Sequence, residues 1–234
     1  MTFRQLFDED SYTYSYVIGS SKGKALIIDP VKDKVEQYLQ LLDELDLKLC
    51  MAIDTHIHAD HITALGDLRD ATGCESILGN KSKVDCVSRY VTDNEVIQLD
   101  EITLKAIYTP GHTDDSFCFL MQRKGKQQLF SGDTLLIRGT GRTDFQNGNA
   151  EDLYESLTKK ILTLDKDTQI FPGHDYKGWT MSTIEEEIQF SERLNLPSKK
   201  AFVQHMNDLK IPNPKMMDIA VPANLKCGNM VNKD

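Results

Sequence analysis

The segment THIHADH, residues 55–61, places three of the chain's six histidines and one aspartate within seven positions. Imidazole and carboxylate groups are costly to bury together unless they bind a metal ion or one another. These donors include no thiolate, so they favour a divalent metal such as Zn, Fe or Mn over copper(I) or an iron-sulfur cluster. The segment therefore predicts a metal site.

Three further donors each follow a glycine at the end of an apolar run. Strand ends beside glycine are where a fold can bring distant side chains to one point. Together with the cluster they give seven candidate ligands, which are His56, His58, Asp60, His61, His112, Asp133 and His174. Seven are enough for two metals bridged by Asp133 and about 3.5 to 4 Å apart. Two histidines and one carboxylate would instead make the facial triad of a mononuclear Fe(II) oxygenase, and ligand counting leaves both arrangements open.

The length of 234 residues suits a single domain spanning residues 1–234. A net charge of −9 argues against nucleic acid or an anionic membrane surface as the main partner. The first residues show no cationic segment followed by a long apolar one, and no stretch approaches the roughly 20 apolar residues of a membrane span, so we expect a cytoplasmic protein. Five scattered cysteines without C-x-x-C spacing indicate neither a disulfide framework nor a thiolate zinc site, and Cys227 is expected to be the most exposed.

Two β-rich sections interleaved with helices predict an α/β fold in which two mixed sheets pack face to face with helices outside. Apolar residues at helical spacing predict helices over 33–47, 60–73, 150–163 and 181–194. The acidic run at 185–187 is expected to be a solvated helix face. β-Branched and aromatic runs predict strands over 12–18, 25–28, 47–54, 76–80, 96–99, 102–109, 116–122, 127–133 and 168–175.

The histidine cluster, with the later GH, SGD and GHD segments, resembles the metallo-β-lactamase superfamily. The resemblance implies an αββα sandwich with the metal site at one edge of the sheets, which agrees with the layers expected above. Within that superfamily, GDTLLIRGTGRTDFQNGNAEDLYES, FPGHDYKGWTMSTIEEE and DIAVPANLKCG resemble the persulfide dioxygenase family. Glyoxalase II is similar only as far as the SGDTL segment.

The family resemblance implies one Fe(II) per chain, held by His56, His112 and Asp133. The remaining polar residues of the site would then support these ligands without binding a second metal; they are His58, Asp60, His61, His174 and Asp175. The implied reaction oxidises glutathione persulfide with O2 and water to sulfite and glutathione, in sulfide detoxification. Two alternatives are a binuclear thioester hydrolase acting on S-lactoylglutathione and a non-catalytic metal-binding or sulfur-binding module.

Glutathione carries carboxylates, so basic residues near the site are candidate substrate contacts. Arginine can hold a carboxylate through two parallel hydrogen bonds. By resemblance the contacts are Arg142 and Tyr176, with Arg138 and Arg193 as further candidates; structural ion pairing of Arg142 or Arg138 with Asp144 or Asp175 is the competing interpretation. The sequence leaves a homodimer open.

Two features depart from the family pattern. Asp114 and Asp115 add negative charge beside His112, which could disfavour an anionic persulfide. Thr140 replaces a cysteine found in some relatives, so any role of that thiol is absent here.

Overall fold

The computed structural model of the protein describes residues 1–229, and the chain divides into two compact units. Unit 1 comprises Met1–Val91, Gln98–Ile102 and the C-terminal segment from Asn213; unit 2 comprises Thr92–Ile97 and Thr103–Pro212. Each unit has its own cluster of buried apolar side chains. The expected single domain over 1–234 stays a prediction.

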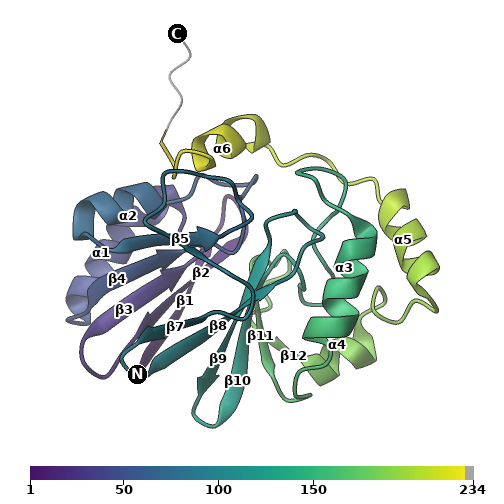
Figure 1. Ribbon diagram of the computed structural model, residues 1–234, viewed down its shortest axis with the longest axis horizontal. Coiled ribbons are helices and arrows are strands. Elements are labelled where there is room, and N and C mark those ends of the chain that lie inside the picture. The colour runs from purple at the N-terminus through teal and green to yellow at the C-terminus, as the bar shows by residue number, and fades with distance from the viewer. Residues whose placement is uncertain (230–234) are drawn as a thin grey trace. The chain divides into compact units, whose positions relative to one another are not determined.

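Unit 1 is built on a six-stranded mixed sheet in the order β1-β2-β3-β4-β5-β6. The first three strands pair antiparallel, and β3 to β6 run parallel. Parallel neighbours need crossover connections, and α1 and α2 lie beside β4 and β5 (Figure 1). The elements of unit 1 are β1 (Thr2–Asp8), β2 (Thr13–Gly19), β3 (Lys24–Ile28), η1 (Lys32–Lys34), α1 (Val35–Glu44), β4 (Lys48–Ile53), α2 (Leu65–Thr72), β5 (Glu75–Gly79), β6 (Arg89–Val91) and α6 (Met217–Asn224).

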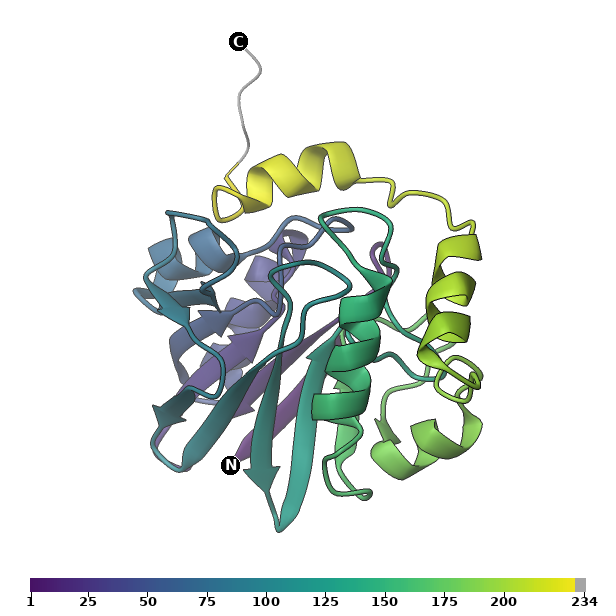
Figure 2. The ribbon, with the colours of Figure 1, turned by 45° about the vertical axis from the view of Figure 1, so that its right-hand side comes forward.

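Unit 2 carries the second six-stranded sheet, in the order β12-β11-β10-β9-β8-β7. It is also mixed, because β10 and β11 run parallel whereas the neighbouring pairs β8-β9, β9-β10 and β11-β12 are antiparallel. Helices α3, α4 and α5 lie on the same side of this unit (Figure 2). Its elements are β7 (Val96–Leu99), which shares residues with unit 1, β8 (Ile102–Tyr108), β9 (Phe117–Arg123), β10 (Lys126–Gly132), α3 (Ala150–Ser156), η2 (Leu157–Ile161), β11 (Gln169–Pro172), β12 (Ser182–Thr183), α4 (Ile184–Phe190) and α5 (Lys199–Asp208).

The expected fold class, two mixed sheets with helices, is confirmed. Strand β2 is buried at all its positions, as its aromatic and β-branched residues favour. Helix α1 buries Tyr38 and Leu42, which lie one turn apart on its apolar face. Gly73 ends α2 with a φ of 72°, the left-handed conformation in which glycine is favoured.

Two predicted helices have different limits in the structure. The helix expected from residue 60 begins at Leu65, because the residues before it bind side chains and backbone elsewhere in unit 1. The helix expected over 181–194 is strand β12 followed by the shorter α4, where the Thr183 side chain accepts a hydrogen bond from the backbone N–H of Glu186. Strand β1 has a mostly half-exposed pattern and was not predicted.

The prediction that Cys227 is the most exposed cysteine was wrong. Cys86 and Cys227 form a disulfide with Cα atoms 5.9 Å apart, and Cys227 is only 1% exposed. The two residues are separated by 141 positions, so the sequence spacing contains no sign of the pair. None of the helices in residues 1–229 is long and apolar enough to cross a membrane.

Candidate metal centre

The histidine cluster lies in unit 1, where the chain leaves the end of β4 at Ile53. Residues His56, His58 and His61 are all at most 4% exposed. Their rings are in contact, with centroids 4.2 Å apart for His56 and His58 and 4.3 Å apart for His58 and His61. The three rings therefore pack in a continuous series.

His56 is oriented by a short relay of hydrogen bonds that ends on Asp29. The Thr55 hydroxyl lies 3.0 Å from Asp29 Oδ2 and 3.0 Å from His56 Nδ1. Since the carboxylate accepts the only hydroxyl proton, Nδ1 of His56 carries the hydrogen and donates it to Thr55. The lone pair of a neutral ring is then on Nε2, where a metal can bind.

Oδ1 of Asp29 also accepts a hydrogen bond from the backbone N–H of Thr55 at 2.7 Å and lies 3.2 Å from Nε2 of His58. Burial raises the pKa of this carboxyl group, and the neighbouring His56 and the Thr55 hydrogen bonds oppose the rise. With Nε2 of His58 directed at Asp29, the ring presents Nδ1 toward Asp60 Oδ1, 3.9 Å away. Asp29, Asp54 and His58 themselves form a buried group whose ligand atoms lie within 4.8 Å of one another.

Asp60 is held by two donors within the same unit. Its Oδ2 accepts hydrogen bonds from Thr13 Oγ1 at 2.9 Å and from His61 Nδ1 at 2.8 Å. The remaining nitrogen of His61, Nε2, is buried and has no hydrogen-bond partner among the described residues. One carboxylate oxygen of Asp60 is thus already hydrogen-bonded to two protein donors.

Unit 2 presents His112, Asp133 and His174, each placed just beyond a strand, as the sequence predicted. His112 Nδ1 lies 2.8 Å from the backbone carbonyl oxygen of Arg142, to which it donates. Its Nε2 then lies 3.5 Å from Asp133 Oδ2, and His174 Nε2 lies 3.6 Å from Asp133 Oδ1. Both distances are longer than a hydrogen bond.

Asp133 Oδ1 is buried and accepts no hydrogen bond from the residues that the structure describes. Two glycines allow this close arrangement. A Cβ atom on Gly141 would lie 2.6 Å from Nδ1 of His112, and one on Gly173 would lie 2.8 Å from Asp133 Oδ1. A carboxylate oxygen without a donor, facing ring nitrogens across more than hydrogen-bond distance, is the environment of a group that binds a cation.

The donors within each unit are therefore of the kind that binds a metal ion. His56 in unit 1 and His112 in unit 2 both direct their Nδ1 protons to protein oxygens and leave Nε2 for a ligand bond. Two neutral imidazoles and one carboxylate are the ligands of a facial triad. Within each unit, the side chains are already oriented as metal ligands require.

Asp175 plays a local role beside His174. Its Oδ2 accepts the backbone N–H groups of Lys177 and Trp179, both at 2.7 Å, and so closes the turn that carries Tyr176. The ring of Tyr176 stacks on His174 with centroids 6.1 Å apart, and Tyr176 is 67% exposed. Asp175 thus orders the loop, and Tyr176 is accessible to a ligand.

Arg142 is fixed by several contacts within unit 2. Nε and one terminal nitrogen of its guanidinium hold the Asp144 carboxylate at 2.6 Å each, and Nη1 donates to the backbone oxygen of Pro212 at 2.7 Å. The guanidinium also lies 4.5 Å from the centroid of the Phe145 ring. The hydrogen bond from Arg142 lowers the pKa of Asp144. The ion pair with Asp144 is the structural pairing that the sequence analysis gave as the alternative to a substrate contact.

Arg138 forms ion pairs with the acidic segment of α4. Its guanidinium contacts Glu186 and lies 2.5 Å from Glu187, whose side chain is fully buried and also accepts from Ser182 at 2.6 Å. The prediction that residues 185–187 form a solvated face is therefore wrong for Glu187. Its burial is possible because Arg138 supplies the compensating charge.

Arg193 differs from the other two arginines. It donates to the backbone oxygen of Thr140 at 2.7 Å and to its hydroxyl at 3.0 Å, and no carboxylate pairs with it among the described residues. Burial lowers the pKa of its guanidinium. Thr140 adjoins Gly141, which packs against His112, so Arg193 is a cation near the ligands of unit 2.

The aspartates beside His112 differ in environment. Asp114 is partly exposed and accepts a hydrogen bond from Asn147 at 3.2 Å, whereas Asp115 is 4% exposed.

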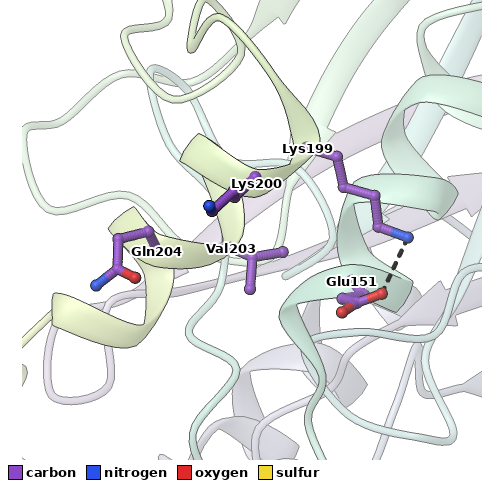
Figure 3. Close-up of a pocket in the computed structure, with 5 residues that line it drawn as sticks. All are labelled: Glu151, Lys199, Lys200, Val203 and Gln204. Carbon is purple, nitrogen blue, oxygen red and sulfur yellow. Dashed lines mark ion pairs between the residues drawn. The ribbon is translucent and has the colours of Figure 1, made fainter.

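A pocket elsewhere in unit 2 lies between α3 and α5, lined by Glu151, Lys199, Lys200, Val203 and Gln204 (Figure 3). Lys199 forms an ion pair with Glu151 there, and none of the predicted site residues lines it.

The sequence motifs did not identify Asp29, Thr55 or Asn224 as residues of the site. Asp29 follows strand β3, the same strand-end position that identified Asp133, so that signal was available. Asn224 gave no such signal, because its contacts with the histidine loop join residues more than 160 positions apart.

The comparisons with known proteins agree with this chemistry. The family model described as the metallo-beta-lactamase superfamily matches residues 8–86 and 87–174. The mitochondrial persulfide dioxygenase ETHE1 of Bos taurus is 43% identical over 227 residues, covering 96% of this chain and 88% of the bovine protein. A crystal structure of ETHE1 from Myxococcus xanthus superposes with a TM-score of 0.94 and 45% identity, covering 98% of this chain and all of that one.

The hydrolases of the competing prediction are more distant. A probable hydroxyacylglutathione hydrolase of Schizosaccharomyces pombe is 30% identical over 189 residues, covering 80% of this chain and 72% of the hydrolase. Both the length of the match and the identity favour the dioxygenases, as the motifs after Asp133 predicted. The chain belongs to the metallo-β-lactamase superfamily and, within it, to the persulfide dioxygenase family, and it is an enzyme of this type.

Proposed function

We propose that the protein binds one Fe(II) per chain through His56, His112 and Asp133 and oxidises glutathione persulfide with O2 and water to sulfite and glutathione. The observation that carries the proposal is the hydrogen-bonding pattern that the two histidines share. Each directs Nδ1–H to a protein oxygen, Thr55 Oγ1 or the Arg142 carbonyl, and keeps Nε2 for a ligand bond. When bound by these three residues, iron would supply the redox chemistry that lets the persulfide and O2 react as neighbours.

The protein contributes orientation and charge. The carboxylate of Asp133 would balance part of the cationic charge, and its buried Oδ1 can take such a partner because no described residue donates to it. We assign supporting roles to His58, Asp60, His61, His174 and Asp175. Asp60 fits this role well, since Thr13 and His61 already donate to it.

We propose that glutathione is held through its carboxylates and backbone by Arg142, Tyr176 and Arg193. Arg193 has no carboxylate partner among the described residues and can take one from the substrate. Tyr176 is exposed beside His174 and offers a hydroxyl. Arg138, the fourth predicted contact, is engaged by Glu186 and Glu187, so any substrate contact would compete with these ion pairs.

We also propose that the enzyme is cytoplasmic and that it has no nucleic-acid or membrane partner. A homodimer is one option for its assembly. The net charge of −9 supports the absence of a nucleic-acid or membrane partner. A disulfide such as Cys86–Cys227 is usually transient or redox-sensing in a reducing compartment. A cytoplasmic location therefore implies that both the oxidised and the reduced forms of this pair occur.

A binuclear thioester hydrolase is the second candidate. Nε2 of His61, which is buried and lacks a hydrogen-bond partner among the described residues, is the observation in its favour, because it could serve a second metal. A non-catalytic sulfur-binding module is disfavoured, since Cys227, which the sequence suggested as the exposed thiol, is buried in a disulfide.

Two measurements on the purified protein decide between these functions. Metal analysis should give about one iron per chain, the count expected of one triad. An oxygen electrode should record consumption on addition of glutathione persulfide, with sulfite formed. Two zinc ions per chain, no oxygen uptake and hydrolysis of S-lactoylglutathione in nitrogen-purged buffer would instead establish the hydrolase.

A further inference from the structure

The loop that carries the histidines has backbone groups that its own segment does not satisfy. Residues 54–63 form no helix or continuous strand, and the residues His58, His61 and Thr63 are at most 4% exposed. Buried backbone carbonyl and N–H groups need partners, because leaving one unpaired costs free energy comparable to a lost hydrogen bond. One side chain near the C-terminus forms hydrogen bonds with backbone groups of all three residues.

Asn224, the last residue of α6, is 2% exposed and makes three hydrogen bonds to this loop. Its Nδ2 donates to the carbonyl oxygens of His58 at 2.8 Å and His61 at 2.9 Å. Its Oδ1 accepts the backbone N–H of Thr63 at 2.8 Å. Two donors and one acceptor are all required, so aspartate of the same shape cannot replace asparagine.

Asn224 is itself held firmly. Three residues later, the carbonyl oxygen of Cys227 accepts the backbone N–H of Gly66 at 3.0 Å, and the Cys227 sulfur is bonded to Cys86. Position 66 has no room for a side chain, since a Cβ atom on Gly66 would lie 2.5 Å from the Cys227 carbonyl oxygen. Hydrogen bonds to Thr63 and Gly66 therefore hold the segment 224–228 against the chain that follows the histidines, and the disulfide ties the same segment to Cys86.

We propose that Asn224 is a positioning residue for the metal centre, which deepens the proposed iron site and rests on it. Asn224 sets the backbone at His58 and His61, their rings pack in sequence against His56, and His56 is thereby held with Nε2 toward the ligand position. Loss of such supporting contacts costs about 10- to 100-fold in metal affinity.

The test compares Asn224→Asp with Asn229→Asp. The first change keeps the shape but places carboxylate oxygens against two carbonyl oxygens, whereas the second makes the same chemical change at an exposed position of the same segment. Iron per chain and the rate of Fe(II) loss to a chromogenic chelator are measured, with thermal unfolding of the metal-free proteins. Folded Asn224→Asp should lose iron about 10 to 100 times faster, and Asn229→Asp should match the wild type.

Asn224→Ser is the second variant, because the smaller neutral side chain leaves room for water to replace the lost bonds. Restored folding with faster iron loss supports the inference. A folded Asn224→Asp that keeps iron at the wild-type rate would overturn it, and so would failure of both variants to fold, which would make the role purely structural. Failure of the proposed function is distinguishable, since the wild type would then hold no iron or show no oxygen uptake.

Discussion

Gly141 lies directly against the imidazole of His112, where a Cβ atom would be 2.6 Å from Nδ1 and 2.6 Å from the backbone oxygen of Asp133. The absence of a side chain at this position therefore allows His112 to reach the Arg142 carbonyl. The contact also links the two candidate ligands of unit 2 through a single backbone position.

Gly141→Ala should displace His112 and Asp133 and weaken iron binding at least tenfold, since a methyl group cannot occupy this space without moving one of them. Gly139→Ala is the matched control, because a Cβ atom there has no neighbour within 4 Å. Fe(II) titration of the metal-free proteins measures the difference. Equal affinities of the two variants would contradict the assignment of His112 as a ligand.

Thr55→Val should weaken iron binding by about 10- to 100-fold while keeping the side-chain shape. The change removes the hydroxyl between Asp29 and His56, so Nδ1 of His56 loses its acceptor and the ring is less firmly oriented. Thr55→Ser restores the hydroxyl and should recover most of the affinity. If valine and serine behave alike in the Fe(II) titration, the relay does not orient His56.

Most of the fold and the chemistry of the site could be predicted from local pattern. His112, Asp133 and His174 became candidates because each follows a strand and a glycine, and the mixed sheets follow from the strand patterns. Two of the failures share one physical cause, which is dependence on distant partners. Glu187 is buried only because Arg138 pairs with it, and the Cys86–Cys227 bond joins positions 141 residues apart.

Removal of the disulfide should lower the free energy of unfolding by about 2 to 5 kcal/mol. The bond closes a long loop and ties the segment after α6 to the region before β6. Cys86→Ser and wild type with a thiol reductant should therefore melt at similar, lower temperatures, and Cys50→Ser should melt like the oxidised wild type. A reductant that leaves the melting temperature unchanged would show that the bond contributes nothing measurable.

Asp8→Asn should reduce stability at neutral pH but not in acid. Burial raises the pKa of Asp8, yet hydrogen bonds from the Ser11 hydroxyl at 2.6 Å and backbone at 2.9 Å, with Lys34 at 3.3 Å, lower it below 3.8 overall. A lowered carboxyl pKa stabilises the folded state above pH 3.8, and this contribution is lost as the pH falls through the folded value.

The expected loss for Asp8→Asn at pH 7 is about 1 to 3 kcal/mol, typical of a hydrogen-bonded charge. Urea unfolding of the metal-free proteins between pH 7 and pH 3 should show the gap from the wild type closing toward the acid end. Asp10→Asn, at an exposed neighbouring position, is the control. A gap that stays constant over this range would rule out the charge of Asp8 as the stabilising feature.

Arg193→Ala should raise the KM for glutathione persulfide roughly tenfold to hundredfold, with little change in kcat, because one charge-assisted contact is worth about 1.5 to 3 kcal/mol. The guanidinium is anchored on Thr140 beside the ligands of unit 2, and no carboxylate among the described residues competes for it. Arg193→Lys keeps the charge without the planar fork and should recover the KM only in part. Lys200→Ala removes an exposed cation from α5 and should leave both constants unchanged. A drop in kcat with an unchanged KM would place Arg193 in support of the metal ligands rather than in contact with glutathione.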